Sequence, residues 1–277
     1  MTDRDLLLSF IREDAPFGDI TSDAIIGDEA CNATISTRQK GIIAGMEEAG
    51  VLCVEFKIAV RFEVIDGDCT DPGAILLRLS GRARDILLIE RTLLNIIGRM
   101  SGIATLTRRM GERVRRVDPS CRIACTRKTA PGLRSLDKKA VVIGGGDPHR
   151  FSLSDGILIK DNHLVLVPLE EAVLRARRHS LYRTIEVEAE SSESAVRAAT
   201  AGADIIMLDN MPPDRITQTL EELTRLGLRD QVVIELSGGI TESNIARYAG
   251  LGADVISVGF LTHSVQNLDV SLEVFPS

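Results

Sequence analysis

From Pro119 onward the chain alternates short apolar segments with helical ones, and this rhythm constrains the fold more than any other feature. Short, continuous apolar strands are typical of a parallel sheet covered on both faces. Helices are expected between them, near 169–179, 191–201, 213–226 and 241–250. The pattern predicts an α/β unit. The six expected strands, rich in Ile and Val, are 122–126, 156–160, 184–188, 205–208, 232–236 and 255–258.

A weak internal repeat favours a barrel-like arrangement of these strands. Residues 201–206 read Ala-Gly-Ala-Asp-Ile-Ile, and residues 251–256 read Leu-Gly-Ala-Asp-Val-Ile. In each copy a glycine suited to the end of a helix precedes a buried strand. A β/α barrel needs this arrangement wherever a helix returns to the next strand. Because only about six strands are strong, the pattern predicts an incomplete, open α/β barrel rather than a closed one.

The part of the chain before residue 105 follows a different pattern. An amphipathic helix is expected at 2–13, and a long helical tract runs from 83 to about 117, with a break or kink expected at Ser101-Gly102. Short strands separated by turn signals indicate a mixed α+β domain over 1–105, followed by a barrel domain over 106–265. The expected strands of the first domain are 33–36, 41–44, 60–64 and 74–79.

Composition limits the partners and the compartment. The formal net charge of −7 argues against nonspecific binding of nucleic acid, so important basic residues should form local clusters. The five cysteines are odd in number and contain no Cys-x-x-Cys pair, which argues against a disulfide framework or zinc site and favours a reducing, cytoplasmic setting. Cys121 and Cys125 are expected to be buried structural thiols. Neither a secretory signal nor an apolar run long enough to span a membrane is found.

Polar side chains gather where the expected strands end. In a β/α barrel, functional side chains lie at the carboxyl ends of the strands. Six successive polar strand ends, with a loop of three glycines at 144–146, therefore indicate one shared site. The segments are Thr-Arg-Lys-Thr at 126–129, Lys-Asp-Asn-His at 160–163, Glu-Val-Glu at 186–188, Asp-Asn at 209–210, Ser-Gly-Gly at 237–239 and Gly-Phe-Leu-Thr-His at 259–263.

The basic members of this set suit an acidic small molecule. Arginine forks match carboxylates in a bidentate manner, so two arginines fit a substrate with more than one carboxylate. In an acidic protein, such a cluster needs an anion to be tolerable. The predicted cationic group consists of Arg127, Lys128, His149, Arg150 and Lys160.

The acidic and glycine-rich members suit a phosphorylated sugar. Glu188 and Asp209, on neighbouring strands, could hold Mg²⁺ or hydrogen-bond ribose hydroxyls. Ser237-Gly238-Gly239 and Gly259 follow strands, where bare backbone N–H groups can cradle a phosphate. The set therefore predicts a site for an acid and a sugar phosphate.

Several nearby residues are interpreted as structural. Glu186 is expected to have a structural or ion-pairing role on the strand face opposite to Glu188. Asp161 and His163 are interpreted as ordering their loop. Lys138, Lys139 and His179 are expected on the solvated surface.

At this point the ordered motifs resemble quinolinate phosphoribosyltransferase, a type II phosphoribosyltransferase family also called nicotinate-nucleotide pyrophosphorylase. The resemblance covers nearly the whole chain. The motifs that carry it are 18–22 (Gly-Asp-Ile-Thr-Ser), 90–95 (Glu-Arg-Thr-Leu-Leu-Asn), 100–105 (Met-Ser-Gly-Ile-Ala-Thr), 126–134 (Thr-Arg-Lys-Thr-Ala-Pro-Gly-Leu-Arg), 158–163, 186–188, 208–210, 237–240 and 261–264.

The resemblance implies an N-terminal α/β sandwich domain, an open barrel, and a C-terminal tail at 266–277 that returns to the first domain. It implies transfer of a phosphoribosyl group from phosphoribosyl pyrophosphate (PRPP) to quinolinate with decarboxylation. The products would be nicotinate mononucleotide, pyrophosphate and CO₂, a step of NAD biosynthesis. The working unit would be a homodimer with shared sites, possibly assembled into hexamers.

By position, the family's roles transfer residue by residue. Arg127, Lys128, His149, Arg150 and Lys160 resemble the quinolinate side, with Arg91 reaching into a neighbour's site. Lys128, Lys160, Glu188 and Asp209 are the expected catalytic residues, and Glu188 and Asp209 also the expected Mg²⁺ ligands. Ser237, Gly238, Gly259 and His263 resemble the phosphate side.

One departure from the family pattern is visible, and three alternatives stay open. The family loop usually reads Gly-Gly-Gly-x-Asn-His-Arg, whereas Pro148 stands here in place of Asn, which predicts altered loop stiffness. The alternatives are a ModD-like relative, of the kind encoded with molybdate transport, that acts on another substrate or none; a lyase using Lys128 or Lys160 as a Schiff base; and a metabolite-binding module.

Overall fold

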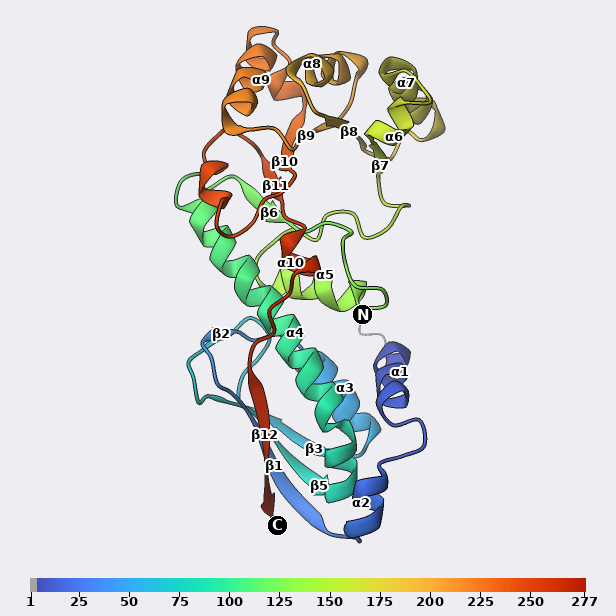
Figure 1. Cartoon of the computed structure of the whole chain (residues 1–277), viewed down its shortest axis with the longest axis vertical. Coiled ribbons are helices and arrows are strands. Elements are labelled where there is room, and N and C mark those ends of the chain that lie inside the picture. The colour runs from blue at the N-terminus through green and yellow to red at the C-terminus, as the bar shows by residue number, and fades with distance from the viewer. Residues whose placement is uncertain (1–3) are drawn as a thin grey trace. The chain divides into compact units, whose positions relative to one another are not determined.

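The computed structural model describes residues 4–277 and forms two compact units (Figure 1). The first consists of the chain up to Arg108 together with Ala130–Gly145 and Ser264–Ser277. The second consists of Arg109–Thr129 and Gly146–His263. The segment Ala130–Gly145 thus lies with the first unit, although it falls inside the 106–265 range assigned to the barrel from the sequence.

The first unit is built on an antiparallel sheet with the strand order β12-β1-β5-β3. β1 alternates buried and exposed residues, as a strand with one face against a core should. β12 pairs with β1, so the end of the chain returns to the N-terminal sheet as the resemblance implies. The strands are β1 (Ala30–Thr37), β3 (Ala59–Phe62), β5 (Ile75–Arg82) and β12 (Val270–Pro276), and β2 (Gly41–Ile42) with β4 (Cys69–Thr70) forms a second, two-stranded sheet.

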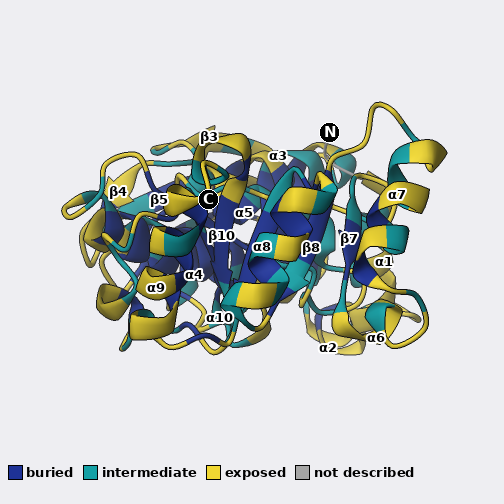
Figure 2. Ribbon diagram, turned by 90° about the horizontal axis from the view of Figure 1, so that it is seen from above, coloured by how far each residue is buried: buried dark blue, intermediate teal, exposed yellow. Residues whose placement is uncertain are grey.

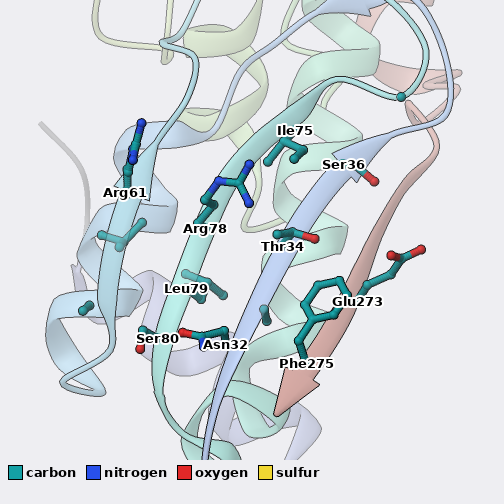
Figure 3. A pocket seen from close by; sticks show the side chains of 14 residues that line it. Asn32, Thr34, Ser36, Arg61, Ile75, Arg78, Leu79, Ser80, Glu273 and Phe275 are labelled. Atoms are coloured by element: carbon teal, nitrogen blue, oxygen red, sulfur yellow. The ribbon is translucent and has the colours of Figure 1, made fainter. Parts of the chain in front are cut away.

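The outer face of the four-stranded sheet carries mainly polar side chains (Figure 3). Asn32 lies opposite Ser80 on one side and Phe275 on the other, and Thr34 lies opposite Arg78 and Glu273. The side chains border a shallow hollow of about 760 Å³. Burial of Ala33, Ile35 and Leu79 shows that the apolar core lies against the other face.

Helix α4 (Ala83–Arg115) is one unbroken helix, so the predicted break at Ser101-Gly102 is wrong. Tertiary contacts explain why these two residues stand inside a helix. The buried Ser101 hydroxyl donates to the Ala44 carbonyl and accepts from the Ala44 N–H, at 3.1 and 2.9 Å. A Cβ atom at Gly102 would lie 2.1 Å from the Gln266 carbonyl oxygen. Gly102 therefore allows the C-terminal segment to approach the helix backbone closely.

The prediction that two lysines of α5 (Arg134–Ile143) lie on the solvated surface is wrong. Lys138 is buried, with 2 % of its surface exposed. The Lys139 ammonium donates to the carboxylates of Glu47 and Glu48, with a distance of 2.7 Å to Glu48. Glu48 is fully buried on α3 (Met46–Glu55), a helix that the sequence analysis did not predict. These contacts are long-range in sequence, and local patterning does not reveal them.

The second unit is an incomplete α/β barrel, as predicted. Its six strands are parallel and follow the order β6-β11-β10-β9-β8-β7, so the first strand of the unit lies beside the last. Figure 2 shows α8 in front of the buried strand β8. The strands are β6 (Arg122–Ala124), β7 (Ile157–Ile159), β8 (Ile185–Ala189), β9 (Ile205–Asp209), β10 (Val233–Ser237) and β11 (Val255–Ser257); the helices are α6 (Asp161–Leu164), α7 (Leu169–His179), α8 (Ser192–Ala201), α9 (Pro213–Arg225) and α10 (Phe260–His263).

The helix expected at 241–250 is absent, and only a short 3₁₀ turn forms at Ile245–Arg247. Polar side chains here bond to the backbone and compete with a helix. The Asn244 side chain accepts from the Thr241 N–H at 2.8 Å and donates to the Gly239 carbonyl at 2.9 Å. The sequence therefore satisfies its backbone locally without a regular helix.

The two copies of the internal repeat form the same set of hydrogen bonds. The carboxylate of Asp204 accepts from the Ile185 N–H, and that of Asp254 accepts from the Ile234 N–H, both at 2.7 Å. An arginine then anchors each aspartate: Arg177 and Arg229 each bond to one carboxylate and also to the carbonyl of the glycine two residues before it. In each copy, an aspartate just before one strand is thus hydrogen-bonded to the start of the neighbouring strand.

Removing one of these ties should destabilise the barrel. We expect Asp254→Ala to lower the free energy of unfolding by about 1–3 kcal/mol, because it leaves the N–H of the buried Ile234 without its acceptor. Asp254→Asn, which keeps an acceptor oxygen, should cost less. Urea denaturation measures the difference, with the exposed Asp230→Ala as control. An Asp254→Ala variant as stable as that control would contradict the role.

All five cysteines are free thiols, and Cys121 and Cys125 are buried as expected. Burial raises the pKa of the Cys53 and Cys121 thiols to about 12. Their thiolates are therefore scarce at neutral pH, which fits a structural role. None of the helices formed by residues 4–277 has the length and apolar character needed to cross a bilayer.

Candidate functional site

All but one of the predicted site residues lie in the second unit, either at the carboxyl ends of the barrel strands or, for His149 and Arg150, in the loop before β7. Parallel strands present these ends at one edge of the sheet, so residues far apart in sequence meet there. The exception is Arg91, which lies exposed on α4 in the first unit. The residues of the second unit are Arg127, Lys128, His149, Arg150, Lys160, Glu188, Asp209, Ser237, Gly238, Gly259 and His263.

Lys160 and Glu188 form an ion pair across two neighbouring strands. Lys160 directly follows β7, which pairs with β8, and its ammonium donates to the Glu188 carboxylate. The Glu188 side chain is 8 % exposed, so this carboxylate is largely withdrawn from water. His163 accepts the Lys160 backbone N–H at 2.9 Å through Nδ1, a contact that fits the loop-ordering role expected for it.

Arg127 and Arg150 lie close enough for their charges to interact, and Arg150 also interacts with Glu186 on the strand of Glu188. The Nε atom of Arg127 is buried and has no hydrogen-bond partner among the described residues. Burial lowers the pKa of Arg150, and the positive charge of Arg127 lowers it further. Two partly desolvated guanidinium groups so placed favour a bound anion.

The loop before β7 presents His149 in an unusual backbone conformation. Its φ angle is +52°, in the left-handed region. Asp147 stabilises the turn, because its Oδ1 accepts the His149 N–H at 2.7 Å. The Asp147 N–H and C=O also bond to Ile123 and Cys125, which ties the loop to β6 and to the residue that follows it. The Asp-Pro sequence thus forms a braced turn; the effect of Pro148 on its stiffness stays a prediction.

Two buried glutamates face the His149 ring. His149 Nε2 lies 3.1 Å from Glu235 Oε2 and 3.9 Å from Glu186 Oε2. Both carboxylates have an Oε1 atom that is buried without a hydrogen-bond partner among the described residues. Sequence reasoning missed Glu235, although a charged residue inside the apolar strand 232–236 was a usable signal.

The prediction for Glu186 was half right. Its ion-pairing surroundings agree with the role expected for it. Its expected face was wrong, because residues two apart on a strand point to the same side. Glu186 and Glu188 therefore share one face of β8, and the charge of Lys160 acts on Glu186 as well as on its partner Glu188.

His149, Glu186 and Glu235 lie close enough to surround a cation, but the protonation of the histidine argues against one. The ligand atoms of these three lie within 4.8 Å of one another. The Arg150 backbone N–H donates to His149 Nδ1 at 2.7 Å, so the proton of the neutral ring is on Nε2. The nitrogen that faces the carboxylates then has no lone pair for a metal.

Glu188 and Asp209 offer the oxygen ligands that Mg²⁺ prefers. In the β8–β9 ladder Glu188 lies opposite Met207, two residues before Asp209, so both carboxylates are on one face of the sheet. Asp209 is only partly buried, and its Oδ2 accepts from the Asn210 amide at 2.5 Å. These residues fit a hard cation, with Glu188 shared between it and Lys160.

A glycine cradle follows β10 and adjoins Asp209. Gly238 and Gly239 have φ angles of +94° and +59°. A Cβ atom at Gly238 would lie 2.3 Å from Asn210 Oδ1, so only glycine allows this approach. The Asn210 N–H donates to the Ser237 carbonyl at 3.0 Å. Asn210, which the sequence analysis listed at this strand end without a role of its own, therefore joins the acidic strand end to the cradle.

Gly259 brings Lys128 and His263 together. A Cβ atom at Gly259 would lie 3.2 Å from both Lys128 Cδ and His263 Cδ2. Thr262 Oγ1 donates to the Lys128 carbonyl at 2.9 Å and so holds the two strand ends in place. A cationic lysine and a histidine then flank a bare stretch of backbone, an arrangement suited to an anion.

Removing the Glu186 carboxylate should change how stability depends on pH. Burial, and then the charge of Glu235, raise the pKa of Glu186 to about 7. A raised folded-state pKa means that the folded protein keeps a proton which the unfolded chain has lost, so stability falls as the pH rises from about 4.5 to about 7.

In this window the slope should reach about 1.4 kcal/mol per pH unit, and Glu186→Gln should flatten it. Denaturant unfolding at a series of pH values, without divalent cations, measures this. The exposed Glu193→Gln serves as control. An unchanged pH profile in Glu186→Gln would rule out this assignment.

Together, the open barrel and its strand ends define an enzyme site for two anions, one acidic small molecule and one phosphorylated sugar. Comparison with known protein families narrows the class of enzyme further. The chain belongs to the quinolinate phosphoribosyl transferase family: the model of its N-terminal domain matches residues 19–101, and that of its C-terminal domain matches residues 103–273.

Individual relatives agree with this assignment over nearly their whole length. The chain is 51 % identical over 274 residues to the probable carboxylating nicotinate-nucleotide pyrophosphorylase of Methanothermobacter thermautotrophicus, covering 98 % of each chain. It is 43 % identical to that of Bacillus subtilis, covering 97 % of this chain and 92 % of the relative. The crystal structure of the Ehrlichia chaffeensis nicotinate-nucleotide pyrophosphorylase matches with a TM-score of 0.93 at 32 % identity, covering 99 % of both chains.

Proposed function

We propose that this protein transfers the phosphoribosyl group of PRPP to quinolinate and releases pyrophosphate and CO₂, forming nicotinate mononucleotide for NAD biosynthesis. One observation carries the proposal: a partly desolvated cationic cluster adjoins a carboxylate pair and a glycine cradle at one edge of the barrel. Quinolinate has two carboxylates, and PRPP has phosphate groups beside ribose hydroxyls. The cationic cluster therefore matches quinolinate in charge, while the carboxylate pair suits the ribose hydroxyls and the glycine cradle offers backbone donors to phosphate.

Arg127, Arg150 and Lys160 are suited to hold the quinolinate carboxylates, with Lys128 and His149 beside them. The ring nitrogen must approach the ribose carbon in line with the departing pyrophosphate. Once that bond forms, the ring is cationic. The bond to the adjacent carboxylate can then break, its electron pair passes into the ring, and a proton takes its place. A partly desolvated carboxylate favours this step.

Glu188 and Asp209 are suited to hold the ribose hydroxyls and Mg²⁺, which would supply countercharge to the pyrophosphate. Ser237, Gly238, Gly259 and His263 are suited to hold phosphate oxygens. A developing negative charge on the leaving group is stabilised best by donors already in place. Chelation of Mg²⁺ should therefore abolish turnover, and added Mg²⁺ should restore it.

The assembly and compartment belong to the same proposal. A homodimer would let Arg91, which is exposed on α4, enter the site of a partner subunit. Pairs could assemble further into hexamers. The free thiols fit a reducing cytoplasm. Nucleic acid and membrane are not expected partners of this acidic chain.

Product analysis by mass spectrometry tests the proposal, with quinolinate, PRPP and Mg²⁺ as reactants and nicotinate as the parallel substrate. We expect nicotinate mononucleotide from quinolinate only. Product from neither substrate would overturn the proposal and favour a ModD-like relative. Borohydride trapping with a keto substrate would instead indicate a Schiff-base lyase.

A further inference from the structure

The link between Arg150 and the barrel interior passes through the His149 ring. The Arg150 backbone N–H donates to His149 Nδ1 at 2.7 Å, so the position of the ring and the position of the Arg150 backbone are coupled. His149 itself has a φ angle of +52°, which a non-glycine residue adopts only when its surroundings hold it there. A neighbouring group must therefore hold the ring in place.

The tautomer of the ring identifies that group. A backbone N–H can only donate, so Nδ1 is an acceptor and Nε2 carries the ring proton. Of the two carboxylates near Nε2, Glu235 Oε2 lies at hydrogen-bond distance, 3.1 Å, whereas Glu186 Oε2 lies at 3.9 Å. Glu235 is therefore the acceptor of the Nε2–H.

The position of Glu235 makes it a rigid anchor. It lies within β10, with neighbouring strands in register on both sides, and only 3 % of its surface is exposed. Its second oxygen, Oε1, is buried without a hydrogen-bond partner among the described residues. A buried carboxylate left half satisfied costs stability, so its presence calls for a reason outside packing.

We infer that Glu235 is a positioning residue for the quinolinate clamp, the group formed by Arg127, Arg150 and Lys160. Glu235 holds the His149 ring by its Nε2–H, and the ring in turn holds the backbone of Arg150. The inference rests on the proposed function, since it assigns Arg150 to a quinolinate carboxylate. Asp147, which accepts the His149 N–H at 2.7 Å, braces the same turn from its other side. Glu235 thus acts on substrate only through His149.

Two substitutions of similar size separate hydrogen bonding from packing. Glu235→Gln keeps an acceptor oxygen for the Nε2–H, and Glu235→Met keeps the volume without it. We expect Glu235→Met to raise the KM for quinolinate about tenfold to a hundredfold, the range for losing one hydrogen bond to a charged group. Glu235→Gln should stay within about threefold of the parent, because the bond survives. The KM for PRPP should stay the same in both.

The double variant shows whether the effect passes through the histidine. In a His149→Phe background, Glu235→Met should cause no further rise in the quinolinate KM. The buried Glu48→Gln, in the other unit, is the matched control and should leave the quinolinate KM unchanged. Equal losses in Gln and Met, additive losses in the double variant, or an equal rise in both KM values would each overturn the inference.

A spectroscopic measurement keeps the test independent of turnover. The chain has four histidines, so His149→Phe assigns the His149 signals in a ¹⁵N spectrum. We expect a protonated Nε2 and a bare Nδ1 in the parent and in Glu235→Gln, and loss of that fixed tautomer in Glu235→Met. A fixed tautomer with no product from the parent would refute the proposed function alone, whereas product with an unfixed tautomer would refute only the role of Glu235.

Discussion

Replacing Arg127 by alanine should raise the KM for quinolinate about a hundredfold, because a desolvated charge that pairs with a carboxylate contributes several kcal/mol to binding. The arginine follows β6 at the barrel edge, and its Nε is buried without a partner among the described residues. That donor is therefore available for a ligand. The Arg150 guanidinium beside it makes a second anionic partner favourable.

The size of the effect should depend on the shape of the cation as well as on its charge. Arg127→Lys keeps the charge but loses the fork that binds a carboxylate through two parallel bonds, so its KM should be intermediate. Initial rates at varied quinolinate and saturating PRPP measure both variants. The exposed Arg116→Ala, in the same unit, is the control. An unchanged quinolinate KM in Arg127→Ala would remove Arg127 from the clamp.

Gly238→Ala should lower kcat/KM for PRPP about a hundredfold or more, because it combines backbone strain of about 1–3 kcal/mol with a steric clash. The φ angle of Gly238 is +94°, and a new Cβ atom would lie 2.3 Å from Asn210 Oδ1 and 2.5 Å from the Asn210 nitrogen. Relief of the clash must move Asn210, which donates to Asp209 and to the Ser237 carbonyl. The glycine cradle and the adjacent carboxylate would shift together.

A second glycine separates strain from the clash. Gly227 also has a positive φ angle, +68°, but a Cβ atom there meets nothing within 4 Å. Gly227→Ala should therefore lose stability without losing kcat/KM for PRPP. Thermal unfolding and steady-state kinetics on both variants make the comparison. If Gly238→Ala behaves as Gly227→Ala does, the cradle does not bind phosphate.

Measuring the kinetic constants for both substrates in both variants checks the two predictions together. Arg127 and Gly238 lie on opposite functional halves of the proposed site, one for the acid and one for the sugar phosphate. Arg127→Ala should change mainly the KM for quinolinate, and Gly238→Ala should change mainly kcat/KM for PRPP. If either substitution changed the kinetic constants for both substrates equally, the cause would be general damage to the barrel rather than loss of a specific contact.

Local sequence signals were sufficient for much of the barrel. The six Ile- and Val-rich strands were predicted within a few residues, because a strand buried on both faces leaves a continuous apolar run. Polar strand ends such as Lys160 and Asp209 stood out for the same reason, since they follow directly on apolar segments. The repeat at 201–206 and 251–256 was visible in sequence, but its role as a pair of aspartate ties was not.

The errors come from interactions that apolar periodicity does not register. The helix expected at 241–250 failed because Asn244 bonds to nearby backbone groups, a competition that apolar periodicity does not register. The break expected at Ser101-Gly102 failed because Ala44 and Gln266, distant in sequence, meet the helix there. Lys138 was assigned to the surface because burial of a charge requires partners that only the folded chain brings near it.

The sequence by itself determined the class of fold, the order of its elements and the set of polar strand ends, because hydrophobic periodicity and turn residues act over short distances. Only the tertiary structure decided which of these groups meet. It paired Lys160 with Glu188, set Asn210 against Gly238 and turned the His149 ring toward Glu235. Those contacts depend on strand register and on the closure of loops, which join residues remote in sequence and leave no local pattern.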